Sequence, residues 1–155
     1  MLTRAAKMFG LLACVGMVLA GSASAATAKT VKAPKRIALE VTVVEAGTKG
    51  ASMDPKLKSL ARELKRAFSK HTQFTWKQTL STKLAKAKPT ANRLKIGKTL
   101  VLTYLGVESK MLRVQLSFDG AQSVVKIRNG GLWFYARRLK GNKALILAIK
   151  ARALR

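Results

Sequence analysis

Alternation of apolar and polar side chains predicts that most of this chain forms β-strands. Successive side chains on a strand point to opposite faces, so an alternating segment has one apolar and one polar face. In residues 74–84 one face is expected to hold four large apolar side chains, Phe74, Trp76, Leu80 and Leu84. Together with turn signals, the pattern predicts strands over seven segments, namely 37–45, 74–84, 99–106, 111–118, 122–128, 131–139 and 144–152.

A single helix is predicted over residues 55–70. Asp54 and Pro55 form its start signal, because an aspartate side chain can cap free amides and proline fits the first helical turn. The apolar residues that follow form one stripe at helical spacing. Membrane-surface helices share this pattern but carry heavier apolar anchors, so packing on the first strand is favoured. The opposite side is basic and offers four candidate contacts for an anionic partner: Lys56, Arg62, Lys65 and Arg66.

The predicted order is one strand, one helix and six further strands. One helix of this length cannot cover seven strands, so the sheet must curl into a partial barrel or fold over itself. The expected fold class is therefore α+β, with one amphipathic helix packed on a twisted, mostly antiparallel sheet of about seven strands. Residues 37–155 are expected to form this one domain, after a flexible basic leader over 26–36.

The first 25 residues have the features of a signal peptide. Arg4 and Lys7 precede an apolar run over 8–20, and residues 23–25 (ASA) supply the small residues of a cleavage site. An uncleaved membrane anchor is an alternative, because no charge interrupts this region, and Cys14 offers a loose lipoprotein signal. After cleavage the chain would have no cysteine and no integral membrane span, and its core alone would stabilise it.

The chain carries 31 Lys and Arg residues against 6 Asp and Glu, a formal net charge of +25. Such a charge favours association with anionic partners, although it can also be merely tolerated. Lysines outnumber arginines, which indicates diffuse attraction more than a site tuned for bidentate phosphate recognition. Residues 85–98 are predicted to be a long exposed loop that adds four candidate contacts: Lys86, Lys88, Arg93 and Lys95.

Catalytic chemistry is not expected from this composition. A hydrolase needs a nucleophile and base, paired carboxylates or metal ligands, and the chain has one histidine and one cysteine. His71 is expected just past the helix, where a cation interacts favourably with the helix dipole. Glu40 and Glu45 differ by an odd spacing and should point to opposite faces of their strand. No catalytic residue, cofactor or metal site is therefore predicted.

The segment 128–139 places three aromatic residues between a glycine-rich turn and two arginines. Two-residue hairpin turns at Asn129-Gly130 and at Gly141-Asn142 would make Trp133 face Lys126 on one side and Lys150 on the other. Phe134 would then belong to the core. The other face would combine aromatic rings with cations, as nucleic-acid and sugar-binding surfaces do, through Lys126, Trp133, Tyr135, Arg137 and Lys150.

A three-residue turn over 129–131 would shift this register by one residue. Ile127 would then face Trp133, and the aromatic face would be more apolar and more readily buried. The helix, the leader or the 85–98 segment could also cover that face. Packing is therefore favoured over a ligand-binding platform.

These features together favour an exported, non-enzymatic binding or accessory protein of a bacterial cell envelope, periplasmic or secreted. It would associate electrostatically with lipopolysaccharide, acidic polysaccharide or anionic lipid. One alternative is an extracytoplasmic nucleic-acid-binding protein that stacks bases on Trp133 and Tyr135. Another is a structural subunit of an envelope complex that contacts an acidic envelope protein.

Overall fold

The computed structural model describes residues 33–154. The predicted signal peptide and most of the predicted leader lie outside these residues. The described chain contains β1 (Arg36–Gly47), β2 (Ser52–Met53), a 3-10 helix η1 (Pro55–Leu60), α1 (Ala61–Ala67), β3 (Gln73–Ala85), β4 (Pro89–Arg93), β5 (Thr99–Glu108), β6 (Met111–Phe118), β7 (Ala121–Arg128), β8 (Leu132–Arg138) and β9 (Ala144–Leu154).

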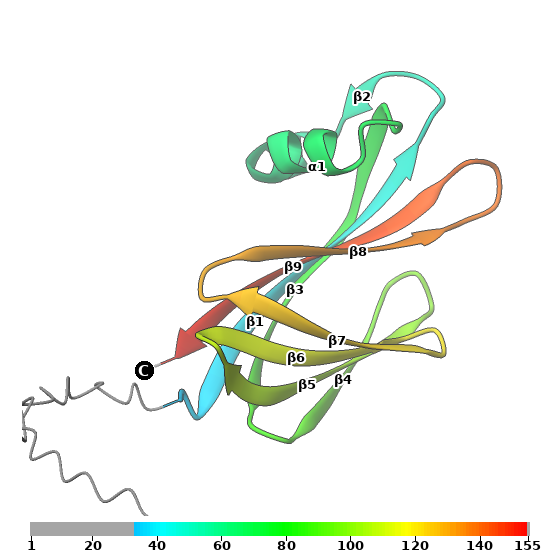
Figure 1. Ribbon diagram of the computed structural model, residues 1–155. Coiled ribbons are helices and arrows are strands. Elements are labelled where there is room, and N and C mark those ends of the chain that lie inside the picture. The colour runs from blue at the N-terminus through cyan, green and yellow to red at the C-terminus, as the bar shows by residue number, and fades with distance from the viewer. Residues whose placement is uncertain (1–32, 155) are drawn as a thin grey trace, which may run out of the picture. The chain divides into compact units, whose positions relative to one another are not determined.

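The strands form two sheets that do not close on each other (Figure 1). The first has five strands in the order β2-β3-β1-β9-β8, and the second has four in the order β4-β5-β6-β7. Every pairing is antiparallel except the short parallel contact of β2 with β3. The predicted α+β class with a mostly antiparallel sheet is confirmed, but the number of sheets and the nine strands differ from the prediction.

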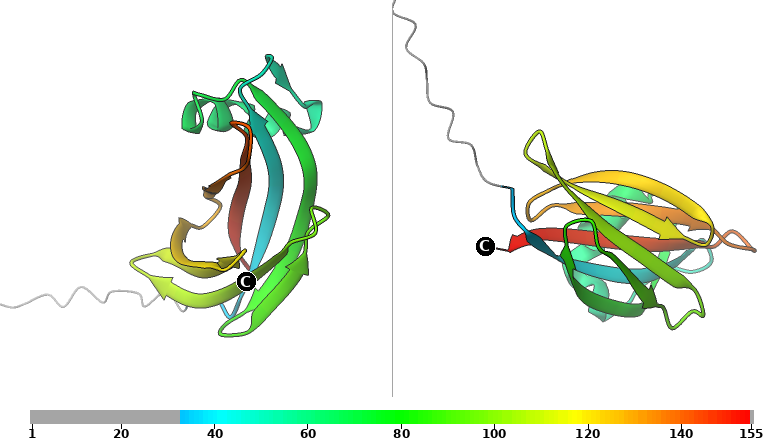
Figure 2. Two further views of the ribbon diagram at one scale, coloured as in Figure 1. Left: turned by 90° about the vertical axis from the view of Figure 1, so that its right-hand side faces the viewer. Right: turned by 90° about the horizontal axis from the view of Figure 1, so that it is seen from below.

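The first sheet has an apolar core on each of its faces. The inter-sheet core lies toward the second sheet and includes Val41, Val43 and Leu147. The helix core lies on the opposite face and includes Val44, Ile146 and Leu64. Figure 1 shows α1 and the second sheet on opposite sides of the layer formed by β1, β3 and β9, and Figure 2 shows how strongly these strands curve.

The two central strands are buried on both faces where the two cores overlap. Residues 41–44 of β1 and residues 144–149 of β9 are all buried. A strand buried on both faces has a near-continuous apolar sequence instead of an alternating one. This explains the run ALILAI at the start of β9, which has no polar face to contribute.

A β-bulge in β3 lets that strand serve both cores. Val43 of β1 pairs with Gln78 and Val44 pairs with Trp76, which leaves Lys77 as an extra residue. An extra residue reverses the side-chain alternation beyond it. Phe74 and Trp76 therefore contact the helix core, while Leu80 and Leu84 contact the inter-sheet core, and the prediction that all four share one face is wrong.

The helical segment is shorter and less regular than predicted. A 3-10 helix over Pro55–Leu60 precedes an α-helix over Ala61–Ala67, in place of one helix over 55–70. The predicted cap is present, because the Asp54 carboxylate accepts a hydrogen bond from the amide of Lys56 (2.9 Å). The helix ends where Phe68 leaves the helical conformation, and the Phe68 ring then packs edge-on against Phe134 at 5.5 Å between centroids.

The Asn129-Gly130 turn does not form the predicted hairpin. It carries the chain from β7 in the second sheet to β8 in the first. The Asn129 side chain accepts a hydrogen bond from the amide of Ala153 (2.8 Å), and the Gly130 amide donates to the carbonyl of Ala151 (2.7 Å). These bonds hold the turn against the end of β9, so Lys126 does not face Trp133, and the predicted pairing of the strands over 122–128 and 131–139 is wrong.

The predicted register of β8 against β9 is wrong by one residue. Trp133 faces Ile149 instead of Lys150, because the connection between the strands is not a two-residue turn. The amide of Leu139 donates to the carbonyl of Lys143 (2.7 Å), which leaves a loop of three residues, 140–142. Gly141 and Asn142 have positive φ in this loop.

This one-residue difference in register exchanges the side chains on the two faces of β8 relative to the prediction. Trp133 and Tyr135 pack against the inter-sheet core, and Tyr135 lies edge-on to Phe118 at 6.0 Å between centroids. Phe134 packs against the helix core. The predicted face that joins Lys126, Trp133, Tyr135 and Lys150 is therefore absent.

The segment 85–98 is not the predicted long loop. It contains β4, which pairs with β5, and Leu94 is buried in the inter-sheet core. The Gln78 side chain accepts a hydrogen bond from the amide of Lys95 (2.6 Å), which fixes the segment against β3. Its proline, glycine and many lysines obscure this short strand in the sequence.

A designed disulfide tests the β8–β9 register. Leu132 and Lys150 face each other across β8 and β9. In a chain with Cys14→Ser, the pair Leu132→Cys and Lys150→Cys should oxidise readily, because directly opposed Cβ atoms lie about 4.5–5.5 Å apart. The pair Leu132→Cys and Arg152→Cys is diagonal, at about 7–8 Å, and should stay reduced. Titration of free thiols in the unfolded protein measures both, and preferential oxidation of the diagonal pair would contradict this register.

Candidate anion-binding sites

Only part of the positive charge is neutralised within residues 33–154. Seven Lys or Arg side chains there form ion pairs with a carboxylate. Three of them are predicted site residues: Arg62 pairs with Glu63 (3.5 Å), Lys126 pairs with Glu108 (2.8 Å), and Arg137 pairs with Asp119. The remaining cations of the described chain keep a strong field that attracts anions.

The predicted cations of the helical segment and those of the 85–98 segment do not gather into one patch. Those of the helical segment are exposed before the start of β3, whereas those of the 85–98 segment are exposed after its end. β3 has 13 residues, which span about 40 Å in an extended strand. The helical group comprises Lys56, Arg62, Lys65 and Arg66, and the second group comprises Lys86, Lys88, Arg93 and Lys95.

Strand register instead brings together a different set of charges on the first sheet. On the face opposite the second sheet, Glu40 of β1 lies between Ser81 of β3 and Lys150 of β9. In the next row Ala38 lies between Lys83 and Arg152. The helix core does not reach this end of the sheet. We call the exposed residues Glu40, Ser81, Lys83, Lys150 and Arg152 the open face.

The open face is hollowed because its central residues are small. A shallow depression of about 450 Å³ is lined by Ala38, Glu40, Ser81, Gly130, Lys150 and Arg152. The Asn129-Gly130 turn forms one side of it. Lys150 and Arg152 line the depression, Lys83 lies beside Ala38, and Glu40 is the single carboxylate among the described residues there, so the local charge is positive.

An aromatic residue lies between the open face and the helical segment. Trp76 donates a hydrogen bond from Nε1 to Oγ1 of Thr79 (3.0 Å), and Thr79 in turn contacts Thr42 (3.2 Å). The ammonium of Lys56 lies 4.0 Å from the centroid of the Trp76 ring, a cation–π contact. One face of Trp76 is therefore already occupied by a cation of the same chain.

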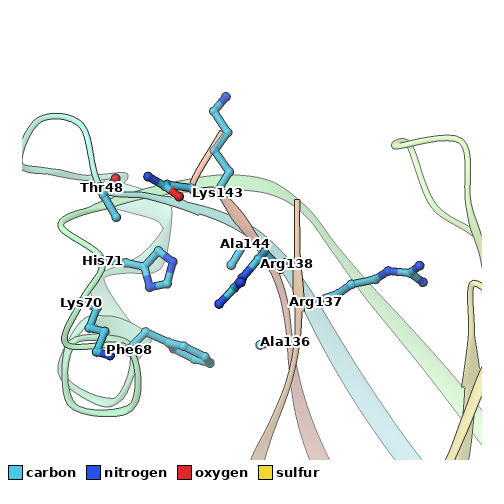
Figure 3. A pocket seen from close by; sticks show the side chains of 10 residues that line it. Thr48, Phe68, Lys70, His71, Ala136, Arg137, Arg138, Lys143 and Ala144 are labelled. Atoms are coloured by element: carbon cyan, nitrogen blue, oxygen red, sulfur yellow. The ribbon is translucent and has the colours of Figure 1, made fainter. Parts of the chain in front are cut away.

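A second cationic depression lies at the C-terminal end of α1. We call it the helix-end pocket, a cavity of about 330 Å³ lined by Phe68, Lys70, His71, Arg138, Asn142 and Ala144 among others. Figure 3 shows the Arg138 side chain pointing toward His71 and Phe68, whereas Arg137 points to the other side of β8. Both arginines are among the residues that line the pocket, but the Arg137 guanidinium pairs with Asp119, whereas the Arg138 side chain points toward His71 and Phe68.

Lys143, at the rim of this pocket, is held by Glu45. The Glu45 carboxylate accepts a hydrogen bond from Lys143 (3.0 Å) and pairs with Lys77, the bulged residue, at 3.1 Å. The hydrogen bond from Lys143, followed by that from Lys77, lowers the pKa of Glu45 below its ordinary value. Glu40 lies on the opposite face of β1, as predicted, so the two carboxylates cannot act together.

The sequence did not single out Lys83, Arg152 or Arg138 as site residues. The signal for the first two is present, because Lys150 and Arg152 alternate at the end of β9 and Lys83 alternates with Ser81 on β3. Their proximity depends on β1 lying between β3 and β9, and local sequence patterns do not predict this strand order. Arg138 could not be separated from Arg137 without the correct register.

Residues 33–154 thus form a mainly-β α+β protein with two cationic depressions on its surface. Within that range no group of three or more His, Cys, Asp or Glu side chains could hold a metal ion. None of the described helices is long and apolar enough to cross a membrane. Comparison with protein-family models, with curated proteins and with solved structures found no match.

The Glu45 ion pairs predict a pH-dependent contribution to stability. Because the pKa of Glu45 is lowered in the folded chain, its contribution is complete above the ordinary value of 4.5 and is lost as the pH falls through the folded value. Glu45→Gln should therefore reduce the free energy of unfolding at pH 7, with a difference that shrinks below about pH 4. Urea unfolding at a series of pH values measures this.

The matched control is Glu63→Gln. Glu63 pairs at 3.5 Å with Arg62, whose side chain is 93% exposed. Such surface pairs contribute little, so the variant should change the free energy of unfolding only slightly. Equal effects of the two substitutions at pH 7 would contradict a special role for Glu45.

Proposed function

We propose that the chain is an exported, non-enzymatic protein that binds an anionic polymer or surface of the bacterial cell envelope. The open face of the first sheet is the contact site, with Lys83, Lys150 and Arg152 as the charged contacts. Acidic polysaccharide, lipopolysaccharide and anionic lipid share the repeated negative charge that such a face attracts. The protein would act as a binding or accessory component, periplasmic or secreted.

The observation that carries this proposal is the clustering of exposed cations on a sheet face with small residues at its centre. Lys83 and Arg152 flank Ala38 in one row, and Lys150 lies in the next row. None of these three cations is paired with a carboxylate in the described chain. They are therefore free to exchange their counterions for the charges of a polymer.

The carboxylates of the described chain support a binding role over an enzymatic one. Asp54 caps η1, while Glu45, Glu63, Glu108 and Asp119 are engaged in ion pairs. Only Glu40 has no such partner in that range, and a single carboxylate does not make an acid–base pair. His71 lies in the helix-end pocket, away from the open face.

The proposal leaves out base stacking on Trp133 and Tyr135. Both rings are half-buried against the inter-sheet core, so they do not form a fully exposed stacking platform. Nucleic acid then remains one polyanion among several, recognised by charge. A structural role in an envelope complex would need a partner that stays bound at high salt.

A matched pair of triple variants tests the open face. In the first, Lys83, Lys150 and Arg152 are replaced by glutamine. Each removed contact should weaken binding by about 1 kcal/mol, so the affinity for heparin, or for vesicles that contain phosphatidylglycerol, should fall about a hundredfold at low salt. The control replaces three exposed loop lysines, Lys49, Lys110 and Lys140, and removes the same charge.

Titration calorimetry or a co-sedimentation assay compares the two variants, with circular dichroism to check folding. The control should lose much less affinity, because its cations lie on separate loops. A steep decline of the parent's binding with salt is also expected. Equal losses in both variants would show that only net charge matters, and no binding by the parent at low salt would refute the proposed function.

A further inference from the structure

The helix-end pocket brings together hydrogen-bond donors for which the described chain supplies no acceptor. Lys70 and Arg138 border the pocket, and neither pairs with a carboxylate in residues 33–154. The Nδ1 atom of His71 is buried and has no hydrogen-bond partner in that range. Two cations without a carboxylate partner in the described chain, beside one imidazole, favour a ligand with several acceptor atoms.

The predicted role of His71 does not account for this geometry. At the end of α1, a histidine needs only to lie near the last carbonyls. Here the imidazole is fixed by an edge-on contact with Phe68, at 6.4 Å between centroids. Phe68 is itself held by Phe134. The ring is thereby held at the pocket, on the side toward which Arg138 points (Figure 3).

The pocket also has room for a small anion, and its lining is positively charged. Ala136 and Ala144 contribute only methyl groups to its lining, and its volume is about 330 Å³. No Asp or Glu lines it, and the nearby Glu45 is already paired with Lys143 and Lys77. An anion in the pocket would therefore meet Lys70, His71 and Arg138, whose side chains pair with no carboxylate in residues 33–154, and no opposing carboxylate.

We propose that the helix-end pocket binds a phosphate group in its dianionic form, free or as a phosphomonoester. Arg138 supplies the planar fork that fits two phosphate oxygens, and Lys70 supplies a mobile ammonium. The His71 imidazole adds a hydrogen bond that a ring N–H donates to a phosphate oxygen. A carboxylate carries a single charge and only two oxygens, so it would use fewer of these donors. The pocket is separate from the open face, and this inference does not depend on polymer binding there.

His71 makes the test direct because it is the only histidine in the chain. Its imidazole signals can be followed by NMR while inorganic phosphate, glucose 6-phosphate or acetate is added at constant ionic strength and pH. Phosphate and glucose 6-phosphate should shift these signals to saturation, and acetate should bind much more weakly. Tighter binding of glucose 6-phosphate than of phosphate would assign the site to a monoester, and equal binding would assign it to the free ion.

The two neighbouring arginines provide a matched control. Arg138→Gln should weaken phosphate binding about tenfold or more, because it removes a charge-assisted contact. Arg137→Gln removes the same charge one residue away. Arg137 also lines the pocket, but its guanidinium points to the other side of β8 and pairs with Asp119, so the affinity should stay within about twofold. Lys70→Gln, an exposed position, should give an intermediate loss and serves as a second variant if Arg138→Gln does not fold.

Three results would overturn the inference: no saturable shift of His71 with either phosphate compound, equal losses in the two arginine variants, or acetate binding as tightly as phosphate. Heparin binding by the Arg138→Gln protein is measured in parallel. Retained heparin binding with lost phosphate binding separates the pocket from the open face. A failure of phosphate binding alone would therefore not contradict the proposed polymer site on the open face.

Discussion

Burial of β1 and β9 on both of their faces is the constraint on which the rest of this structure depends. The second sheet covers one face and the helical segment covers the other, so the centre of the first sheet must be apolar throughout. β3 reaches both cores only because the bulge at Lys77 reverses its alternation. The same bulge aims Lys77 at Glu45 and so connects the sheet to the rim of the helix-end pocket.

Two-sided burial also decides where the charge can lie. Cations are excluded from the centre of the first sheet and occupy the helical surface, the loops and the uncovered end of the sheet. At that end β1 lies between β3 and β9. Lys83 of β3 and Arg152 of β9 therefore flank Ala38 of β1, although they are far apart in sequence. The pocket arises in a comparable way, where the end of α1 meets the three-residue loop between β8 and β9.

Local patterns predicted the elements well and their partners poorly. The alternation of β1, β5 and β6, the Asp54 cap and the apolar stripe that contains Leu57 and Leu64 could all be recognised, because each depends on neighbouring residues. The change of sheet at Asn129-Gly130 could not, because a strong hairpin signal was overridden by packing on β9. A single extra residue in the β8–β9 loop then reversed the roles of Trp133 and Phe134.

We propose that the uncovered end of the first sheet, and not charge in general, selects an anionic polymer. Amide chemical-shift mapping by two-dimensional NMR, with a short heparin oligosaccharide added at moderate salt, tests it most directly. The largest changes in amide chemical shift are expected at residues 38–40, 81–83 and 150–152, with little change in the second sheet. Shifts spread evenly over the exposed basic loops, or centred on β5 and β6, would contradict it.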